Sequence, residues 1–167
     1  MELEELIYTY SDYLYRIAYS YVKDEQTAEE VVQDVFFKFY KTSIQFENQA
    51  HIKTYLTRMI INRSYDYLRS WKHRKNNVFK VFHLSRPGVD QDFVEQSESN
   101  TILQSVLGLP VKYREAIILY YYEDLSIKEI AEMLFTAEST IKSRLQRGRA
   151  ELKTSLQDTE WEVLKHE

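Results

Sequence analysis

Very few residues in this chain interrupt a helix. The 167 residues include three Gly and two Pro, which destabilise a helix interior by about 1 and 3 kcal/mol relative to Ala. A β-sandwich or barrel needs many turns, and turns are rich in Gly and Pro. The scarcity of both residues therefore favours an all-α fold, and the length allows one ordinary domain or two small ones.

Apolar residues recur at helical spacing in the first part of the chain. One pattern covers residues 6–21, a second covers 28–39 and a third covers 52–71. The polar segment 23–27 separates the first two and ends in Thr27, a residue type that caps helix N-termini. Three amphipathic helices in succession predict a helical bundle.

The helical periodicity fails from about residue 76 to 99. An Arg-Pro-Gly turn signal at 86–88 is followed there by an acidic, polar stretch with little to bury. We therefore expect two small helical domains, an N-terminal bundle over 1–75 and a C-terminal helix-turn-helix domain over 101–160. A flexible linker over 76–100 would join them.

The C-terminal block contains the parts of a helix-turn-helix. Leu-Pro at 109–110 opens a helix, and Ser-Ile-Lys-Glu at 126–129 matches a capping box before a second one. After a break at 135–137, a third helix has apolar residues on one side and basic residues elsewhere. The small Ala131 would let two helices cross closely, as in DNA-binding helix-turn-helix proteins. An ordinary helical hairpin with a charged outer face is the alternative.

The net charge of -4 is unusual for a nucleic-acid-binding protein, but the charges are unevenly placed. Residues 1–36 carry nine acids against two bases, whereas residues 58–75 carry six bases against one acid. Residues 90–98 carry four acids and no base, and residues 142–153 carry five bases against one acid. Two basic segments in an otherwise acidic chain predict two polyanion contacts. Two solvated helix faces are the alternative.

Residue types that carry catalysis or bind metals are missing or scattered. The chain has no Cys, and its four His lie in different segments without a carboxylate at metal-ligand spacing. It has no Gly-rich phosphate loop and no nucleophile motif. We therefore expect no enzyme activity, no catalytic residue, no cofactor and no metal. No stretch approaches the roughly 20 apolar residues that span a bilayer, and the N-terminus is acidic, so we expect a cytoplasmic protein without membrane insertion.

Two regions of the chain resemble a known family. Residues 125–134 (LSIKEIAEML) and 140–152 (TIKSRLQRGRAEL) are similar to the fourth conserved region of extracytoplasmic-function sigma factors. Residues 24–36 are similar to the polymerase-binding helix of the second region, and residues 60–69 (IINRSYDYLR) to its promoter-melting helix. The two motifs in this order are highly specific for the family. The resemblance implies a bacterial RNA polymerase specificity factor that catalyses nothing itself.

The resemblance implies a contact with core RNA polymerase through the helix that follows residue 24. For the valines of that helix, the bundle core is the expected place. The run 36–40 is too aromatic for all its rings to face one core, so some rings would face the partner. Carried over residue by residue, the contact comprises Glu29, Glu30, Gln33, Asp34 and Phe36.

In the family, the second region captures a flipped base of the −10 element and opens the duplex, which costs a few kcal/mol per base unless a pocket receives it. The loop before the melting helix corresponds here to residues 46–51, and the basic helix that follows would hold phosphates. The expected −10 contacts are Phe46, Asn48, Gln49, His51, Arg58, Asn62, Arg63, Arg69, Trp71 and Lys72.

The last helix of the C-terminal block would read the −35 element in the major groove. The sequence departs from the family in the preceding turn, because Phe135 stands where Gly is usual and Ala137 where Ser usually caps. Either Phe135 is left-handed, at a cost of about 1 kcal/mol, or the turn is rearranged with Thr136 as N-cap, which we expect. The expected −35 contacts are Arg114, Lys128, Ser139, Thr140, Lys142, Ser143, Arg144, Gln146 and Arg147.

The implied partners are core RNA polymerase and promoter DNA. Factors of this family are usually held inactive by an anti-sigma factor, often anchored in the membrane, and the resemblance implies one here. The acidic linker would be either a simple tether or an autoinhibitory segment that pairs with the basic helices. A stand-alone helix-turn-helix regulator that never binds polymerase is the alternative function.

Overall fold

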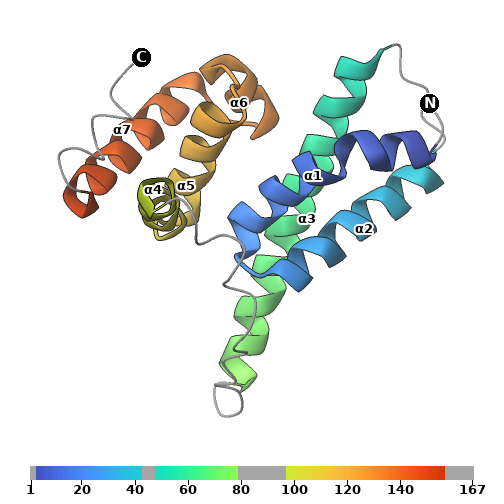
Figure 1. Cartoon of the computed structure of the whole chain (residues 1–167), viewed down its shortest axis with the longest axis horizontal. Coiled ribbons are helices and arrows are strands. Elements are labelled where there is room, and N and C mark those ends of the chain that lie inside the picture. Colours follow the sequence, from blue (N-terminus) through green and yellow to red (C-terminus); the bar gives the residue numbers. More distant parts are fainter. Residues whose placement is uncertain (1–2, 43–47, 79–96, 157–167) are drawn as a thin grey trace. The chain divides into compact units, whose positions relative to one another are not determined.

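The computed structural model describes residues 3–42, 48–78 and 97–156, with residues 71–78 and 97–100 described by their backbone alone. Every element within these ranges is a helix (Figure 1). The chain divides into two compact units, Met1–Val78 and Phe79–Glu167. The predicted all-α fold is confirmed. The predicted acidic linker lies mostly outside the described residues.

The first unit is a bundle of three helices, α1 (Leu3–Val22), α2 (Glu25–Lys41) and α3 (Gln49–Val78). Each helix packs against the other two. The residues that define the helical pattern of α1 are all buried: Leu6, Tyr10, Leu14, Ile17 and Tyr21. All three valines of α2 are buried as well. The core also contains a hydrogen bond of 3.0 Å between the hydroxyls of Tyr13 and Thr57, which satisfies two buried polar groups.

The junction between α1 and α2 differs from the prediction that Thr27 caps the second helix. Lys23 ends α1 with φ 57, and Asp24 is the N-cap of α2. Its carboxylate accepts a hydrogen bond from the Thr27 amide at 2.9 Å and from the Thr27 hydroxyl at 2.6 Å. A carboxylate at the N-cap also complements the positive end of the helix dipole. Thr27 therefore lies in the first turn, where it is buried.

The second unit contains α4 (Ser97–Leu107), α5 (Val111–Ile117), the π-helix η1 (Ile118–Tyr122), α6 (Ile127–Met133) and α7 (Glu138–Ser155). The helix start after Pro110 and the capping box of Ser126 with Glu129 are confirmed. Helix α4 is not apparent in the sequence, because its first residues are polar. It packs on α5 and α7.

Helices α5 and α7 approach each other closely at Gly148. A β-carbon at this position would lie 3.0 Å from Cγ1 of Ile117 and 3.5 Å from Cβ of Tyr113. Glycine lowers helix propensity in the middle of α7, but a β-carbon there would require the Ile117 side chain to shift. The residue therefore serves the contact between the two helices.

The turn between α6 and α7 is built without the expected Thr136 cap. Phe135 is left-handed with φ 51, and its side chain is 79% exposed. The Thr136 amide donates to the Ala131 carbonyl at 2.9 Å, which is the long bond of a Schellman motif at the end of α6. Helix α7 begins after Ala137, which has no side-chain cap. The prediction of a rearranged turn is wrong.

Replacing Phe135 with Gly should stabilise the second unit. The left-handed conformation costs an L-residue about 1–2 kcal/mol. Gly avoids this strain, but it destabilises the folded state by about 0.5–1 kcal/mol because it loses more conformational entropy on folding. The exposed ring gives up little burial. We expect a gain of about 0.5–1 kcal/mol in the free energy of unfolding for Phe135→Gly, measured by urea denaturation. Phe135→Ala keeps the strain and is the control, so equal effects of Gly and Ala would contradict this account.

Candidate nucleic-acid interface

Helix α7 has one buried face and one exposed polar face. Ile141, Leu145, Gly148 and Leu152 are buried against the rest of the unit. The helix has 3.6 residues per turn, so residues about two positions away from a buried residue lie on the opposite face. In the first turns, the exposed residues on or beside that face include Ser139, Lys142, Ser143, Gln146 and Arg147.

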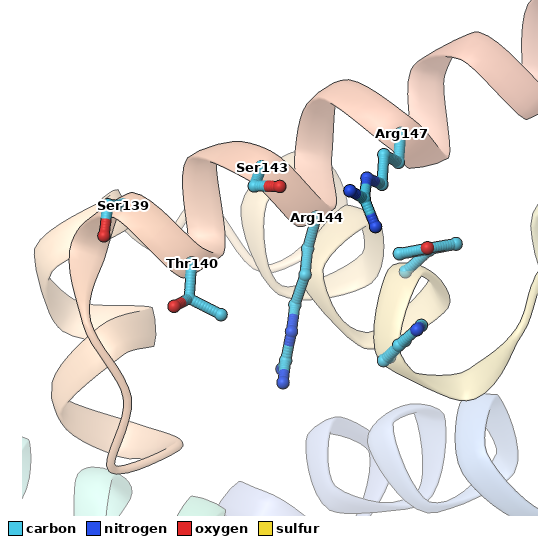
Figure 2. A pocket seen from close by; sticks show the side chains of 7 residues that line it. Ser139, Thr140, Ser143, Arg144 and Arg147 are labelled. Atoms are coloured by element: carbon cyan, nitrogen blue, oxygen red, sulfur yellow. The ribbon is translucent and has the colours of Figure 1, made fainter.

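A concavity of about 360 Å³ lies beside this face, between α7 and the start of α5 (Figure 2). Hydroxyl groups and cationic side chains line it, and no carboxylate is among its lining residues. Figure 2 shows Arg144 and Arg147 projecting from α7 on the side of this concavity. The residues that line it are Lys112, Tyr113, Ser139, Thr140, Ser143, Arg144 and Arg147.

Tyr113 lines the concavity together with two cationic residues, Lys112 and Arg147. A hydrogen bond from Arg147 lowers the pKa of the Tyr113 hydroxyl, and the positive charge of Lys112 lowers it further. The Lys112 ammonium lies 5.0 Å from the centroid of the Tyr113 ring, within cation–π range. The ring is buried at 9% exposure. Lys112 and Tyr113 were not among the predicted site residues, because only the fold brings the start of α5 beside α7.

Arg144 has a structural partner inside the unit. Its Nη1 donates to Oε1 of Glu115 at 2.9 Å, and the Glu115 side chain is 3% exposed while that of Arg144 is 26% exposed. A buried carboxylate requires such a partner. The predicted DNA contact of Arg144 is therefore replaced, in this conformation, by an ion pair that fastens α7 to α5.

Arg114 is also placed differently from the prediction of a phosphate contact. It is 3% exposed, and its Nη1 donates to the backbone carbonyls of Leu107 at 2.9 Å and Leu109 at 3.2 Å. These carbonyls end α4 and precede α5, so the guanidinium ties the two helices together. The prediction is wrong for Arg114. Lys128 is exposed on α6, as a phosphate contact requires.

On the first unit, α2 presents an acidic and aromatic surface. Glu29, Glu30 and Gln33 are exposed, as predicted for a polymerase contact. Phe36 is 6% exposed and belongs to the core, so the predicted contact through its ring is wrong. The neighbouring rings of Phe37 and Tyr40 are 60% and 69% exposed instead. The aromatic run signalled outward rings, but only the bundle geometry identifies which ones.

Asp34 and Arg63 were predicted for two different contacts, and they bind each other. The Asp34 Oδ2 accepts hydrogen bonds from Nε of Arg63 at 2.8 Å and from Nη2 at 2.6 Å. Their side chains are 47% and 32% exposed. The pair links α2 to α3, and both side chains remain partly exposed.

Several predicted −10 residues form one stripe along α3. His51, Arg58, Asn62 and Arg69 are separated by seven, four and seven positions, which returns each to the same side of a helix. His51, Asn62 and Arg69 are exposed and Arg58 is half-buried. Gln49 begins α3 and is exposed. Asn48 precedes α3, and its Oδ1 accepts from the His51 amide at 3.0 Å. Phe46 and the side chains of Trp71 and Lys72 lie outside the described residues.

Neither a candidate metal site nor a candidate membrane span is present in the described part of the chain. No group of three or more His, Cys, Asp or Glu side chains gathers there in a way that could hold a metal ion. None of the helices in that part has the length and apolar character required to cross a bilayer.

Family models match both units of the chain. "Sigma-70 region 2" matches residues 6–74, and "Sigma-70, region 4" matches residues 99–152. The ECF RNA polymerase sigma factor SigW of Bacillus subtilis (strain 168) is 31% identical over 165 residues, covering 92% of this chain and 88% of that protein. SigM of the same organism is 31% identical over 157 residues, covering 92% of this chain and 94% of that protein.

Solved structures share the fold. A sigma factor, RpoE, in complex with the anti-sigma factor NepR from Bartonella quintana superposes with a TM-score of 0.69 at 24% identity, covering 90% of this chain and 94% of that chain. CnrH in complex with the cytosolic domain of CnrY superposes with a TM-score of 0.62 at 19% identity, covering 91% and 85%.

Removing Arg144 should destabilise the second unit, because the buried Glu115 carboxylate loses its ion-pair partner. We expect Arg144→Ala to lower the free energy of unfolding by about 3 kcal/mol or more. The double variant Glu115→Leu with Arg144→Met, which removes both charges, should recover most of this loss. Urea denaturation followed by circular dichroism measures both. A double variant as unstable as the single one would show that the ion pair is not the cause.

Proposed function

The chain belongs to the extracytoplasmic-function group of the sigma-70 family, and we propose that its two units divide promoter recognition between them. Sigma factors are regulatory subunits that direct core RNA polymerase to promoters. We assign residues 1–75 to polymerase binding and the −10 element, residues 101–160 to the −35 element, and residues 76–100 to the connection. The observation that carries this assignment is the presence of both region matches in one chain, each over an exposed polar helix face.

The exposed face of α7 supports the −35 assignment. A recognition helix must present polar side chains to base edges while its other side is held by a core. Lys142, Ser143 and Gln146 lie on the outer face, and the buried face consists of aliphatic residues and Gly148. We propose that these three residues read bases. Ser139 and Thr140, in the first turn, would contact the adjacent backbone together with Lys128 of α6.

The stripe on α3 supports the −10 assignment. Two arginines, an asparagine and a histidine on one helix side suit a single strand, since cations hold phosphates and amides or imidazoles bond base edges. Gln49 and Asn48 stand at the beginning of this stripe. We propose that the opened nontemplate strand runs along it. Arg63 would join once Asp34 releases it.

The exposed part of α2 supports the polymerase assignment. Glu29, Glu30 and Gln33 offer a polar surface, and Phe37 with Tyr40 adds two aromatic rings, a residue type enriched in protein interfaces. We propose that this surface docks on core polymerase. A stand-alone regulator would need no such surface and no second region. For this reason the proposed function is that of a polymerase subunit that catalyses no reaction itself.

We also propose regulation by an anti-sigma factor. One structural relative was solved with the anti-sigma factor NepR and the other with the cytosolic domain of CnrY. An inhibitor of this chain would cover the exposed surfaces of α2 or α7, and anchoring of the inhibitor in the membrane would leave the factor itself in the cytoplasm. Core polymerase and the chromosome are there.

Polymerase binding should depend on the exposed acids of α2. Reversing Glu30 to Lys should weaken binding to core RNA polymerase about tenfold or more, because a like charge then faces the partner's basic groups. Gel filtration and titration with labelled core enzyme measure the effect. Glu5→Lys, an exposed acid of α1, is the control for the change in net charge. Unchanged co-elution of Glu30→Lys would remove this surface from the proposal.

Base reading should depend on Lys142. With core polymerase present, Lys142→Ala should reduce discrimination between a promoter fragment and the same fragment with a mutated −35 element by about 5- to 150-fold, equivalent to about 1–3 kcal/mol. The promoter would be found by run-off transcription on genomic fragments. Lys153→Ala, near the end of the same helix, is the control. A loss of affinity that is equal for both fragments would mean that Lys142 contacts only the backbone.

A further inference from the structure

We infer that Lys112 of α5 and Arg147 of α7 form a clamp for one backbone phosphate of the DNA, with Tyr113 holding the arginine in place. This inference rests on the proposed function of α7 and extends it to a residue outside the helix-turn-helix. It also assigns Arg147 to the backbone rather than to a base.

The composition of the concavity points to an anion. Lys112 and Arg147 are both exposed and both line the concavity, and the Lys112 ammonium lies over the ring of Tyr113, which lines it too. Two positive charges on one concavity repel each other unless an anion sits between them. Glu115 lies nearby, but its carboxylate is engaged by Arg144. No carboxylate among the lining residues therefore neutralises Lys112 and Arg147.

Three hydroxyl groups of α7 complete the lining of the concavity. Ser139, Thr140 and Ser143 line the same concavity and offer hydrogen-bond donors to phosphate oxygens.

The position of the concavity makes DNA the source of this phosphate. It flanks the exposed face formed by Lys142, Ser143 and Gln146, and Ser143 belongs to both surfaces. A helix that enters the major groove has a phosphate backbone along its side. The clamp would therefore fix how deeply and at what angle α7 sits, without reading sequence itself.

The buried Tyr113 ring explains how Arg147 is held. A long arginine side chain has many conformations, and fixing one costs entropy on binding. Tyr113 lines the same concavity as Arg147, and a hydrogen bond from Arg147 is the main cause that lowers the pKa of the Tyr113 hydroxyl. Under the proposal, this hydrogen bond selects one conformation of Arg147 before DNA arrives.

The test measures binding of the full-length chain to a duplex of arbitrary sequence as a function of salt concentration. Lys112→Ala should weaken binding about fivefold near physiological salt, and should reduce the slope of log affinity against log salt by about 0.9. Lys153→Ala is the matched control on α7 and should change neither quantity as much. An unchanged slope for Lys112→Ala, or failure of the wild-type chain to bind any duplex at low salt, would overturn the clamp.

Tyr113→Phe separates positioning from contact, because it keeps the buried ring and removes only the hydroxyl. It should weaken duplex binding, and it should have no further effect when Arg147 is already Ala. An equal loss in both backgrounds would contradict the positioning role. Failure of the wild-type chain to direct core polymerase to a promoter would sink the proposed function instead, and the slope on the arbitrary duplex would still report on the clamp.

Discussion

The ion pair between Arg144 and the buried Glu115 determines which face of α7 is available. A carboxylate at 3% exposure is stable only with a cationic partner, so α7 must turn Arg144 toward α5. This rotation places Gly148 against Ile117 and Tyr113, and it brings Arg147 to the concavity that Tyr113 lines. The outward face and the flanking concavity both follow from that one orientation.

The first unit uses an ion pair in a different way. Asp34 and Arg63 join α2 to α3 at a site that is still partly exposed, where such a pair adds little net stability because water screens it. Its interest lies in its position between the acidic surface of α2 and the basic stripe of α3. The pair therefore joins the surface proposed for polymerase to the stripe proposed for DNA.

The turn of the helix-turn-helix shows how a motif keeps its geometry when its usual residues are absent. The Schellman bond from the Thr136 amide to the Ala131 carbonyl requires a left-handed residue at position 135, whatever its side chain. Phe135 accepts the strain, and its ring remains largely exposed beside Lys128 and Glu132. The tertiary packing of α6 on α7 therefore outweighs a local cost of about 1–2 kcal/mol.

Local patterns in the sequence determined the all-α fold, the helix pattern of the first unit, the start after Pro110 and the capping box at Ser126, because each depends on residues within a turn or two of one another. The same patterns could not separate Arg144 from Arg147 or Phe36 from Phe37, since each pair has the same side-chain chemistry at nearby positions. Glu115 is 29 positions from Arg144, as Asp34 is from Arg63. Only the tertiary structure decided these roles, because a side chain's burial and partner depend on which distant helix packs against it.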